Sequence, residues 1–303
     1  MIVTRIVDRL MEPIAQMMQP PPGMHFDFLH PKGEPALLAP DSVSWRIFKN
    51  PVSVFIGGVA AVILELAEPS VRSGVWDHSS FRKDAVMRLR RTGAAAMMTV
   101  YGPAEAAEEM IERVVRIHDQ IRGTTPSGLP YKANDQRLLD WVQATASYGF
   151  IEAYSRFVHR LTEPERSQAI AEGAVAARLY GAVGAPRSHA EWKALLAKTE
   201  PTLERSPIVF EFLDIMNNAP LVARPLRAVQ RLMVRAAIDI VPAHVRVILG
   251  LEHQGLSSMQ RRLVKLAGWI SDRVPIRAAP PAQASIRVGR NPTFLYRPAN
   301  ARR

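Results

Sequence analysis

A histidine stands on the apolar side of a helix that the sequence predicts to begin near Pro103. His118 follows Ile111 by seven residues and Val114 by four, which is the spacing of one helical face. An imidazole in this position either binds a metal ion or packs in the core with a single hydrogen bond. Spacing alone favours the core interpretation, and it leaves the metal-ligand interpretation open.

The chain contains no cysteine, which excludes disulfides, iron–sulfur clusters, thiolate-held haem and cysteine nucleophiles. A metal would therefore rest on nitrogen and oxygen ligands. His159, His189, His244 and His253 show no ligand spacing to one another. The sequence also lacks a GxSxG elbow, a P-loop, an HExxH pair and a GxGxxG turn after a strand, so the generic patterns of catalysis and nucleotide binding are missing.

A basic segment, RLRRTGAAAMMTVYG at 88–102, precedes the helix that carries His118. Arg88, Arg91 and Thr92 fall at i, i+3 and i+4 and so share one helix face. The small residues at 93–96 would let another group approach that helix closely. The same pattern is also typical of a solvated basic face.

The net charge of +11 is unevenly distributed, because residues 221–303 hold 15 Lys and Arg against 3 Asp and Glu. Within this region Arg224, Arg227, Arg231 and Arg235 recur at helical spacing. Such a face could meet nucleic acid, an anionic membrane or a phosphorylated substrate, although a solvated face is the more frequent reason for it. No aromatic interleaving, zinc finger or helix-turn-helix is present, so we do not expect nucleic acid as a partner.

Helix periodicity covers nearly the whole chain, and alternating strand patterns are scarce. We therefore predict an all-α, single-domain helical bundle, with an N-terminal amphipathic helix and loop (1–39), a helical domain (40–272) and a basic irregular C-terminal tail (273–303). The N-terminus lacks the apolar core of a signal peptide, and the apolar run at 54–64 is shorter than the roughly 20 residues that cross a bilayer. A soluble, cytoplasmic protein is expected.

Capping signals predict where individual helices begin and end. Pro51 should open a helix that Pro69 stops, with Gly57 and Gly58 in close contact with another helix or a planar ligand. Capping boxes are predicted at Thr162 with Glu165 and at Ser188 with Glu191, and Ser79 or Ser80 should cap a helix from about Asp84 to Val100. A helix is also expected over about 135–161, where Trp141 and Tyr148 are candidates to line a pocket. Residues 71–85 should form a broken helix and loop, and residues 122–136 a turn-rich loop.

The order of several short motifs resembles that of the DUF2236 family, which contains the fungal mycophenolic-acid oxygenase and the bacterial latex-clearing rubber oxygenases. The motifs are GGVAAVILELAEP, SGVWDHSSF, RLRRT, VYG and RIHDQIRG, followed by Pro130-Tyr131 and Asp140-Trp141-Val142. Each is weak alone, and their order and spacing over about residues 40–255 are fairly specific. The resemblance implies an all-α fold with a globin-like core around haem b.

The resemblance also implies roles for particular residues. His118 would be the haem-iron ligand, and Arg88, Arg91 and Thr92 would line the opposite side of the haem, where relatives carry Arg-x-x-Lys-Thr. Arg91 replaces a lysine that can coordinate iron, and a guanidinium has no lone pair to give. Glu68 stands where many relatives have histidine and would accept a proton from the substrate, or else lie in solvent at a helix end. His78 would contact a ligand or a haem propionate, or merely cap the next helix.

These implications lead to two hypotheses of different classes. The first is a haem b dependent oxygenase that uses dioxygen to oxidise an apolar substrate of isoprenoid, polyprenyl or lipid-like chemistry. The second is a non-catalytic helical protein that binds haem or lipid, or that serves as an interaction scaffold. The N-terminal amphipathic helix and the basic C-terminal face would also permit peripheral contact with a membrane.

Overall fold

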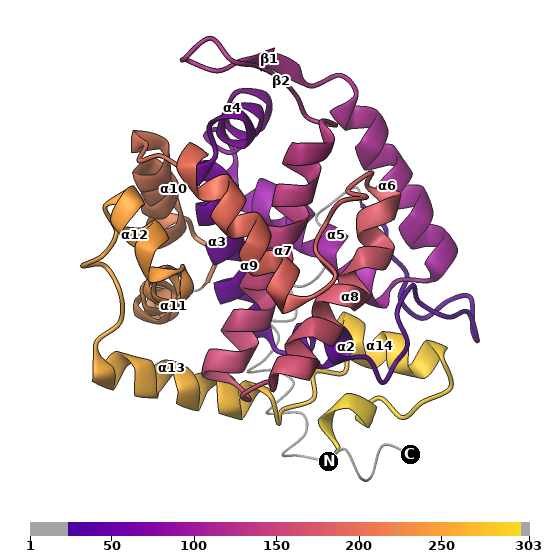
Figure 1. The fold of residues 1–303 in the computed structure, drawn as a ribbon. Helices are drawn as coiled ribbons and strands as arrows, with labels where there is room; N and C mark the ends of the chain where they lie inside the picture. Colours follow the sequence, from indigo (N-terminus) through magenta and orange to yellow (C-terminus); the bar gives the residue numbers. More distant parts are fainter. Residues whose placement is uncertain (1–23, 223, 298–303) are drawn as a thin grey trace.

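The protein is described here by a computed structural model that covers residues 24–222 and 224–297, and its all-α class agrees with the prediction (Figure 1). The predicted N-terminal helix lies outside the described residues. The helices are α2 (Val43–Phe48), α3 (Pro51–Ala67), α4 (Pro69–His78), α5 (Ala85–Tyr101), α6 (Ala104–His118), α7 (Gln136–Phe157), α8 (Glu163–Leu179), α9 (His189–Thr199), α10 (Pro207–Asn218), α11 (Arg227–Ile240), α12 (Ala243–Leu249), α13 (Ser258–Ser271) and α14 (Pro280–Arg287), with short 3₁₀ turns at Glu200–Thr202, Arg224–Leu226 and Phe294–Tyr296.

The segment predicted as a turn-rich loop after His118 contains a small hairpin. Strand β1 (Arg122–Thr124) pairs antiparallel with β2 (Pro130–Lys132), and Gly123 lies opposite Tyr131. A Cβ atom on Gly123 would lie 2.7 Å from the Tyr131 hydroxyl, so glycine is needed for this ring to cross the hairpin. The hairpin packs on α4 at one end of the molecule (Figure 1).

Helices α3 and α7 cross at very short range in the centre of the fold. A Cβ atom on Gly57 would lie 2.7 Å from the Cα atom of Phe150, and one on Gly149 would lie 2.4 Å from the carbonyl oxygen of Gly57. The predicted close contact of Gly57 is therefore with a helix. Helices α10, α11 and α13 pack against α3, and α8 and α13 pack against α7. The central pair thus provides a rigid frame for the residues on its surface.

Most predicted helix starts match the structure. The Asn50 side chain accepts from the Ser53 backbone N–H at 3.1 Å to cap α3, and the Thr162–Glu165 capping box is complete. At Ser188 only half of the predicted box forms, because the Glu191 carboxylate accepts from the Arg187 N–H instead.

The region between α3 and α5 differs from the prediction in two ways. The segment predicted as a broken helix is continuous over Pro69–His78, and α5 is capped by Asp84 rather than by Ser79 or Ser80. The Asp84 carboxylate accepts from the Met87 N–H at 3.0 Å. An aspartate directly before the first helical residue is better placed for this bond than a serine several residues upstream.

The C-terminal segment predicted as irregular instead contains α14. Arg287, at the end of α14, is 1% exposed and donates to the carbonyl oxygens of Glu34, Phe28 and Tyr101 at 2.8–2.9 Å. These partners come from distant segments, so no local pattern around residue 287 could reveal them. The described part of the predicted tail is consequently joined to the rest of the fold.

Candidate functional site

His118 is the last residue of α6. The helix face that carries it becomes less buried towards the C-terminal end of α6. Ile111 is buried, whereas Val114, Val115 and His118 are half-buried. Among the described residues, no protein group hydrogen-bonds the buried Nδ1 atom of His118. Burial lowers the pKa of His118, the nearby Arg88 lowers it further, and Asp119 opposes the shift. The imidazole is therefore neutral at neutral pH, the form that binds metals.

Arg88 lies on α5, and its positive charge acts on His118. Its Nη1 donates to the Thr92 hydroxyl at 2.9 Å, and that hydroxyl donates to the Arg88 carbonyl oxygen at 3.0 Å. Its buried Nε atom has no hydrogen-bond partner in the described part of the chain. Burial lowers the pKa of Arg88 and Arg91 lowers it further, while Glu65 raises it. Arg88 thus brings a half-buried positive charge whose buried Nε has unused donor capacity.

Glu65, on α3, is the carboxylate that approaches Arg88. Burial raises the pKa of Glu65 to about 7, and both Arg88 and Thr145 of α7 oppose this rise. By surface area the residue is only half-buried.

Arg88 of α5 thus interacts electrostatically with both His118 of α6 and Glu65 of α3. We refer to these three residues as the 65–88–118 cluster. Sequence reasoning predicted two of its members and missed Glu65. The signal for Glu65 was present, because this carboxylate interrupts the longest apolar stretch of the chain and stands inside a helix with a fully buried face.

Arg91 and Thr92 belong to the edge of this cluster. Both are exposed, Thr92 touches it through Arg88, and Arg91 acts on Arg88 through its charge. Open space lies next to them, because a Cβ atom built on Gly93 would meet no atom within 4 Å. The predicted approach of another group to this stretch of α5 is sterically permitted.

Glu68 and His78 make contacts with residues outside the 65–88–118 cluster. The Glu68 side chain is 2% exposed, accepts from the Val71 N–H at 2.8 Å and pairs with Arg137 at 2.9 Å. It therefore caps α4 and is not exposed to solvent, while the proton-accepting role stays a prediction. His78 is exposed at the end of α4, with its ring edge-on to Tyr131 at a centroid distance of 6.4 Å.

The residues of the 65–88–118 cluster fit a haem group. No set of three or more His, Asp or Glu side chains in the described segments could hold a bare metal ion, but haem iron needs only one protein ligand. His118 offers a neutral imidazole with an unpartnered buried nitrogen. Arg88 and Arg91 supply positive charge for the anionic propionate groups of a haem.

A separate pocket of about 530 Å³ lies among α7, α8, α9 and the start of α12. Tyr148, predicted as a pocket residue, lines it and stacks on Trp192 at 4.1 Å between ring centroids. Trp141, the other candidate, is a core residue whose indole donates to the Leu64 carbonyl oxygen at 3.3 Å. None of the predicted haem-site residues lines this pocket.

Comparison with protein families gave one match. The model described as "ER-bound oxygenase mpaB/B'/Rubber oxygenase, catalytic domain" matches residues 45–272, from α2 to the residue after α13, and this range contains the whole 65–88–118 cluster. No curated protein and no solved structure matched the chain, so the globin-like arrangement of the core stays a prediction. Because the match covers well over half of the 303 residues, the chain belongs to the mpaB/rubber oxygenase catalytic-domain family.

Proposed function

We propose that this protein is a haem b dependent oxygenase that uses dioxygen to oxidise an apolar substrate of isoprenoid or lipid-like chemistry. The observation that supports the proposal is the 65–88–118 cluster, in which the half-buried Arg88 interacts electrostatically with a neutral imidazole and with a carboxyl group of raised pKa, all within the residues that the family model matches. The apolar substrate class rests on the family description, which includes a rubber oxygenase.

His118 would hold the haem through its neutral ring, and the bound haem would supply the iron centre at which dioxygen reacts. Arg91 has no lone pair to give to iron, so it would act by charge alone. The unpartnered Nε of Arg88 would donate to an anionic oxygen atom of a ligand or a propionate group.

Glu65 would be the proton acceptor in this site. A carboxyl group with a pKa of about 7 is ionised in half of the molecules at neutral pH, and it takes up a proton more readily than an ordinary glutamate. We assign this role to Glu65 rather than to Glu68, because the Glu68 carboxylate is already held by Val71 and Arg137.

An absorption spectrum of the purified protein tests the haem assignment directly. The protein should show a Soret band, and His118→Ala should lose it. The matched control is His253→Ala, because this histidine is 93% exposed and belongs to none of the motifs quoted for the family, and this variant should load haem fully. Full haem loading of His118→Ala would refute the assignment.

A second measurement separates an oxygenase from a haem carrier. Glu65→Gln should retain the Soret band but consume dioxygen much more slowly than the wild type in the presence of a polyprenyl or unsaturated-lipid substrate. A protein that binds haem normally but consumes no dioxygen with such substrates would instead be the non-catalytic binding protein of our second hypothesis.

A further inference from the structure

Helix α13 is fixed in the fold by one face. Val264, Gly268 and Ser271 are buried, and a Cβ atom on Gly268 would lie 2.5 Å from the Phe157 carbonyl oxygen. The Asn50 side chain donates to the Gly268 carbonyl oxygen at 2.9 Å and accepts from the Ser271 hydroxyl at 3.2 Å. These contacts with α3 and α7 determine which side of α13 faces outward.

The outward face of α13 is apolar. Met259, Leu263, Leu266 and Ile270 follow one another at helical spacing and form a single stripe, which we call the 259–270 stripe. Each of them is between 47% and 74% exposed, and Trp269 beside them is 49% exposed. Single exposed apolar residues are ordinary, but a continuous stripe of this length on the outside of a helix marks an interaction surface.

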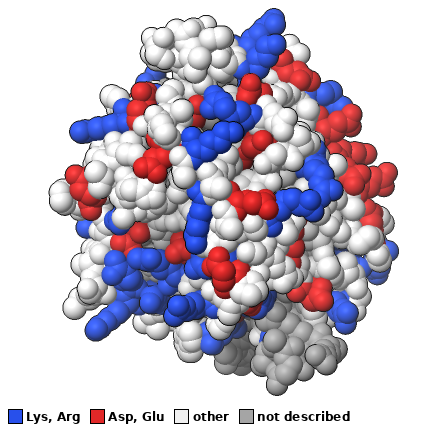
Figure 2. Space-filling view, viewed as in Figure 1, with Lys and Arg blue, Asp and Glu red and all other residues white. Residues whose placement is uncertain are grey.

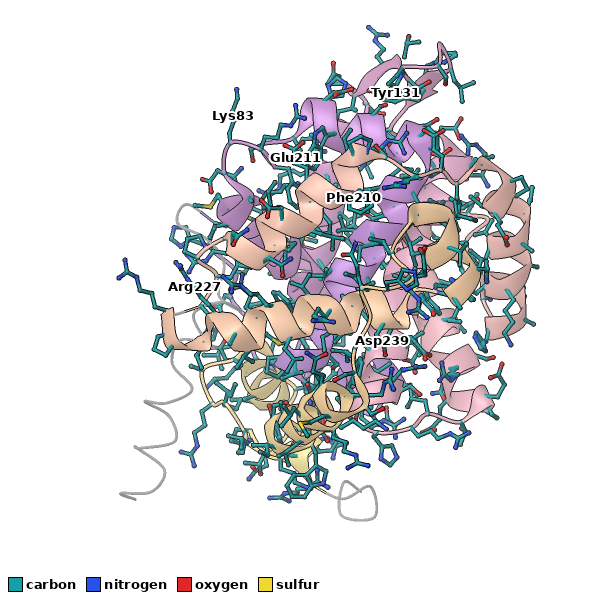
Figure 3. The ribbon with its side chains drawn as sticks, turned by 90° about the vertical axis from the view of Figure 1, so that its left-hand side faces the viewer. Lys83, Tyr131, Phe210, Glu211, Arg227 and Asp239 are labelled. Carbon is teal, nitrogen blue, oxygen red and sulfur yellow. The ribbon has the colours of Figure 1, made fainter. Side chains whose placement is uncertain are left out.

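Positive charge borders the 259–270 stripe. Arg262 and Lys265 are exposed next to it, and the Arg273 guanidinium lies 4.0 Å over the Trp269 ring. Figure 2 shows Lys and Arg gathered at the lower left of the molecule, where α13 lies in Figure 1. Arg261 is not part of this border, because it pairs at 3.0 Å with Asp239, which lies near the end of α11 (Figure 3).

We propose that α13 is an interfacial helix that inserts the 259–270 stripe into an anionic phospholipid surface. Apolar residues with an aromatic ring among them and Lys and Arg alongside are the features that place a helix in the headgroup region of an anionic bilayer. A second copy of the chain would face the same positive charges on α13, so charge disfavours self-association through this helix. The proposal does not depend on the oxygenase chemistry.

The position of α13 fits a helix that lies along a membrane rather than across it. No single described helix is long and apolar enough to span a bilayer, and only α3 and α4 taken together pass such a test, with a bend of 111° between them. Helix α13 lies at the end of the molecule opposite the hairpin that carries Tyr131, as Figures 1 and 3 both show. The lipid surface and the hairpin that follows His118 are therefore on different sides.

Vesicle flotation of the full chain tests the proposal. The protein should float with vesicles of phosphatidylcholine mixed with phosphatidylglycerol, bind vesicles of phosphatidylcholine alone much more weakly, and dissociate as salt is raised. The double variant Leu263→Asp/Leu266→Asp should lose at least about tenfold in binding, because charged groups cannot enter the apolar layer. Arg262→Ala/Lys265→Ala should weaken binding to the anionic vesicles only.

The matched control is Val183→Asp/Val247→Asp, because these valines are 66% and 64% exposed elsewhere on the surface. This variant should float like the wild type. Circular dichroism confirms that each variant is folded. Brominated lipid should quench the tryptophan fluorescence of Trp269→Phe less than that of the wild type. Equal flotation of the Leu263/Leu266 variant and the wild type would overturn the proposal, as would a change from dimer to monomer in that variant without any vesicle binding.

Discussion

The substitution Glu65→Gln should change the pH dependence of folding stability by an amount that the structure fixes. The pKa of Glu65 rises from 4.5 to about 7 on folding, a difference of about 2.5 units, and each unit corresponds to about 1.36 kcal/mol. The folded protein therefore binds this proton more tightly than the unfolded chain does. Stability contributed by Glu65 is complete below pH 4.5 and is lost as the pH rises through about 7.

Glutamine mimics the protonated form of Glu65 and does not titrate. Relative to the wild type, Glu65→Gln should thus gain about 3 kcal/mol of unfolding free energy between pH 4 and pH 8, mostly between pH 4.5 and 7. Urea denaturation of both proteins at a series of pH values measures this gain, and all other titrating groups cancel in the comparison. A difference that stays constant with pH would refute the burial of Glu65 in a shielded site.

Glu165 provides a control of opposite sign in the same assay. Burial raises the pKa of Glu165, but the Thr162 N–H and Arg46, at 2.7 Å, outweigh this effect and hold the pKa at about 2. Stability from this carboxylate is present above pH 4.5 and is lost as the pH falls towards 2. Glu165→Gln should therefore lose stability relative to the wild type as the pH rises, whereas Glu65→Gln should gain it.

Two further substitutions test neighbouring assignments. Glu68→Gln should cost about 1–2 kcal/mol of unfolding free energy in a denaturation assay, because it weakens the cap of α4 and the pair with Arg137, yet it should leave dioxygen consumption close to that of the wild type. If Glu68→Gln abolishes dioxygen consumption while haem loading and stability stay normal, the proton-accepting role belongs to Glu68. Arg287→Ala should cost at least about 3 kcal/mol, because three carbonyl oxygens lose their donor. A midpoint of thermal unfolding equal to that of the wild type would show that α14 does not hold the N-terminal loop.

Sequence reasoning succeeded where a local signal determines the outcome. The start of α3 follows from Asn50 and Pro51, and the contact of Gly57 with another helix follows from its lack of a side chain. The assignment of His118 as an iron ligand depends on the family motifs and stays a prediction, because helical spacing alone did not distinguish a ligand from a core histidine. Arg287 was missed because its three partners are more than 180 residues away in the chain.

Glu65 and Glu68 are similar carboxylates, and Pro69 gives them different surroundings. The two are three residues apart, so they would share a face if α3 continued. Pro69 disfavours helical backbone at the preceding residue, and Glu68 accordingly has an extended conformation with φ −88° and ψ 122°. Its carboxylate is thereby directed to the first N–H groups of α4, while Glu65 remains on α3 and lies beside Arg88. Pro69 is thus the residue that commits Glu68 to capping α4 and leaves Glu65 available for the proposed proton transfer.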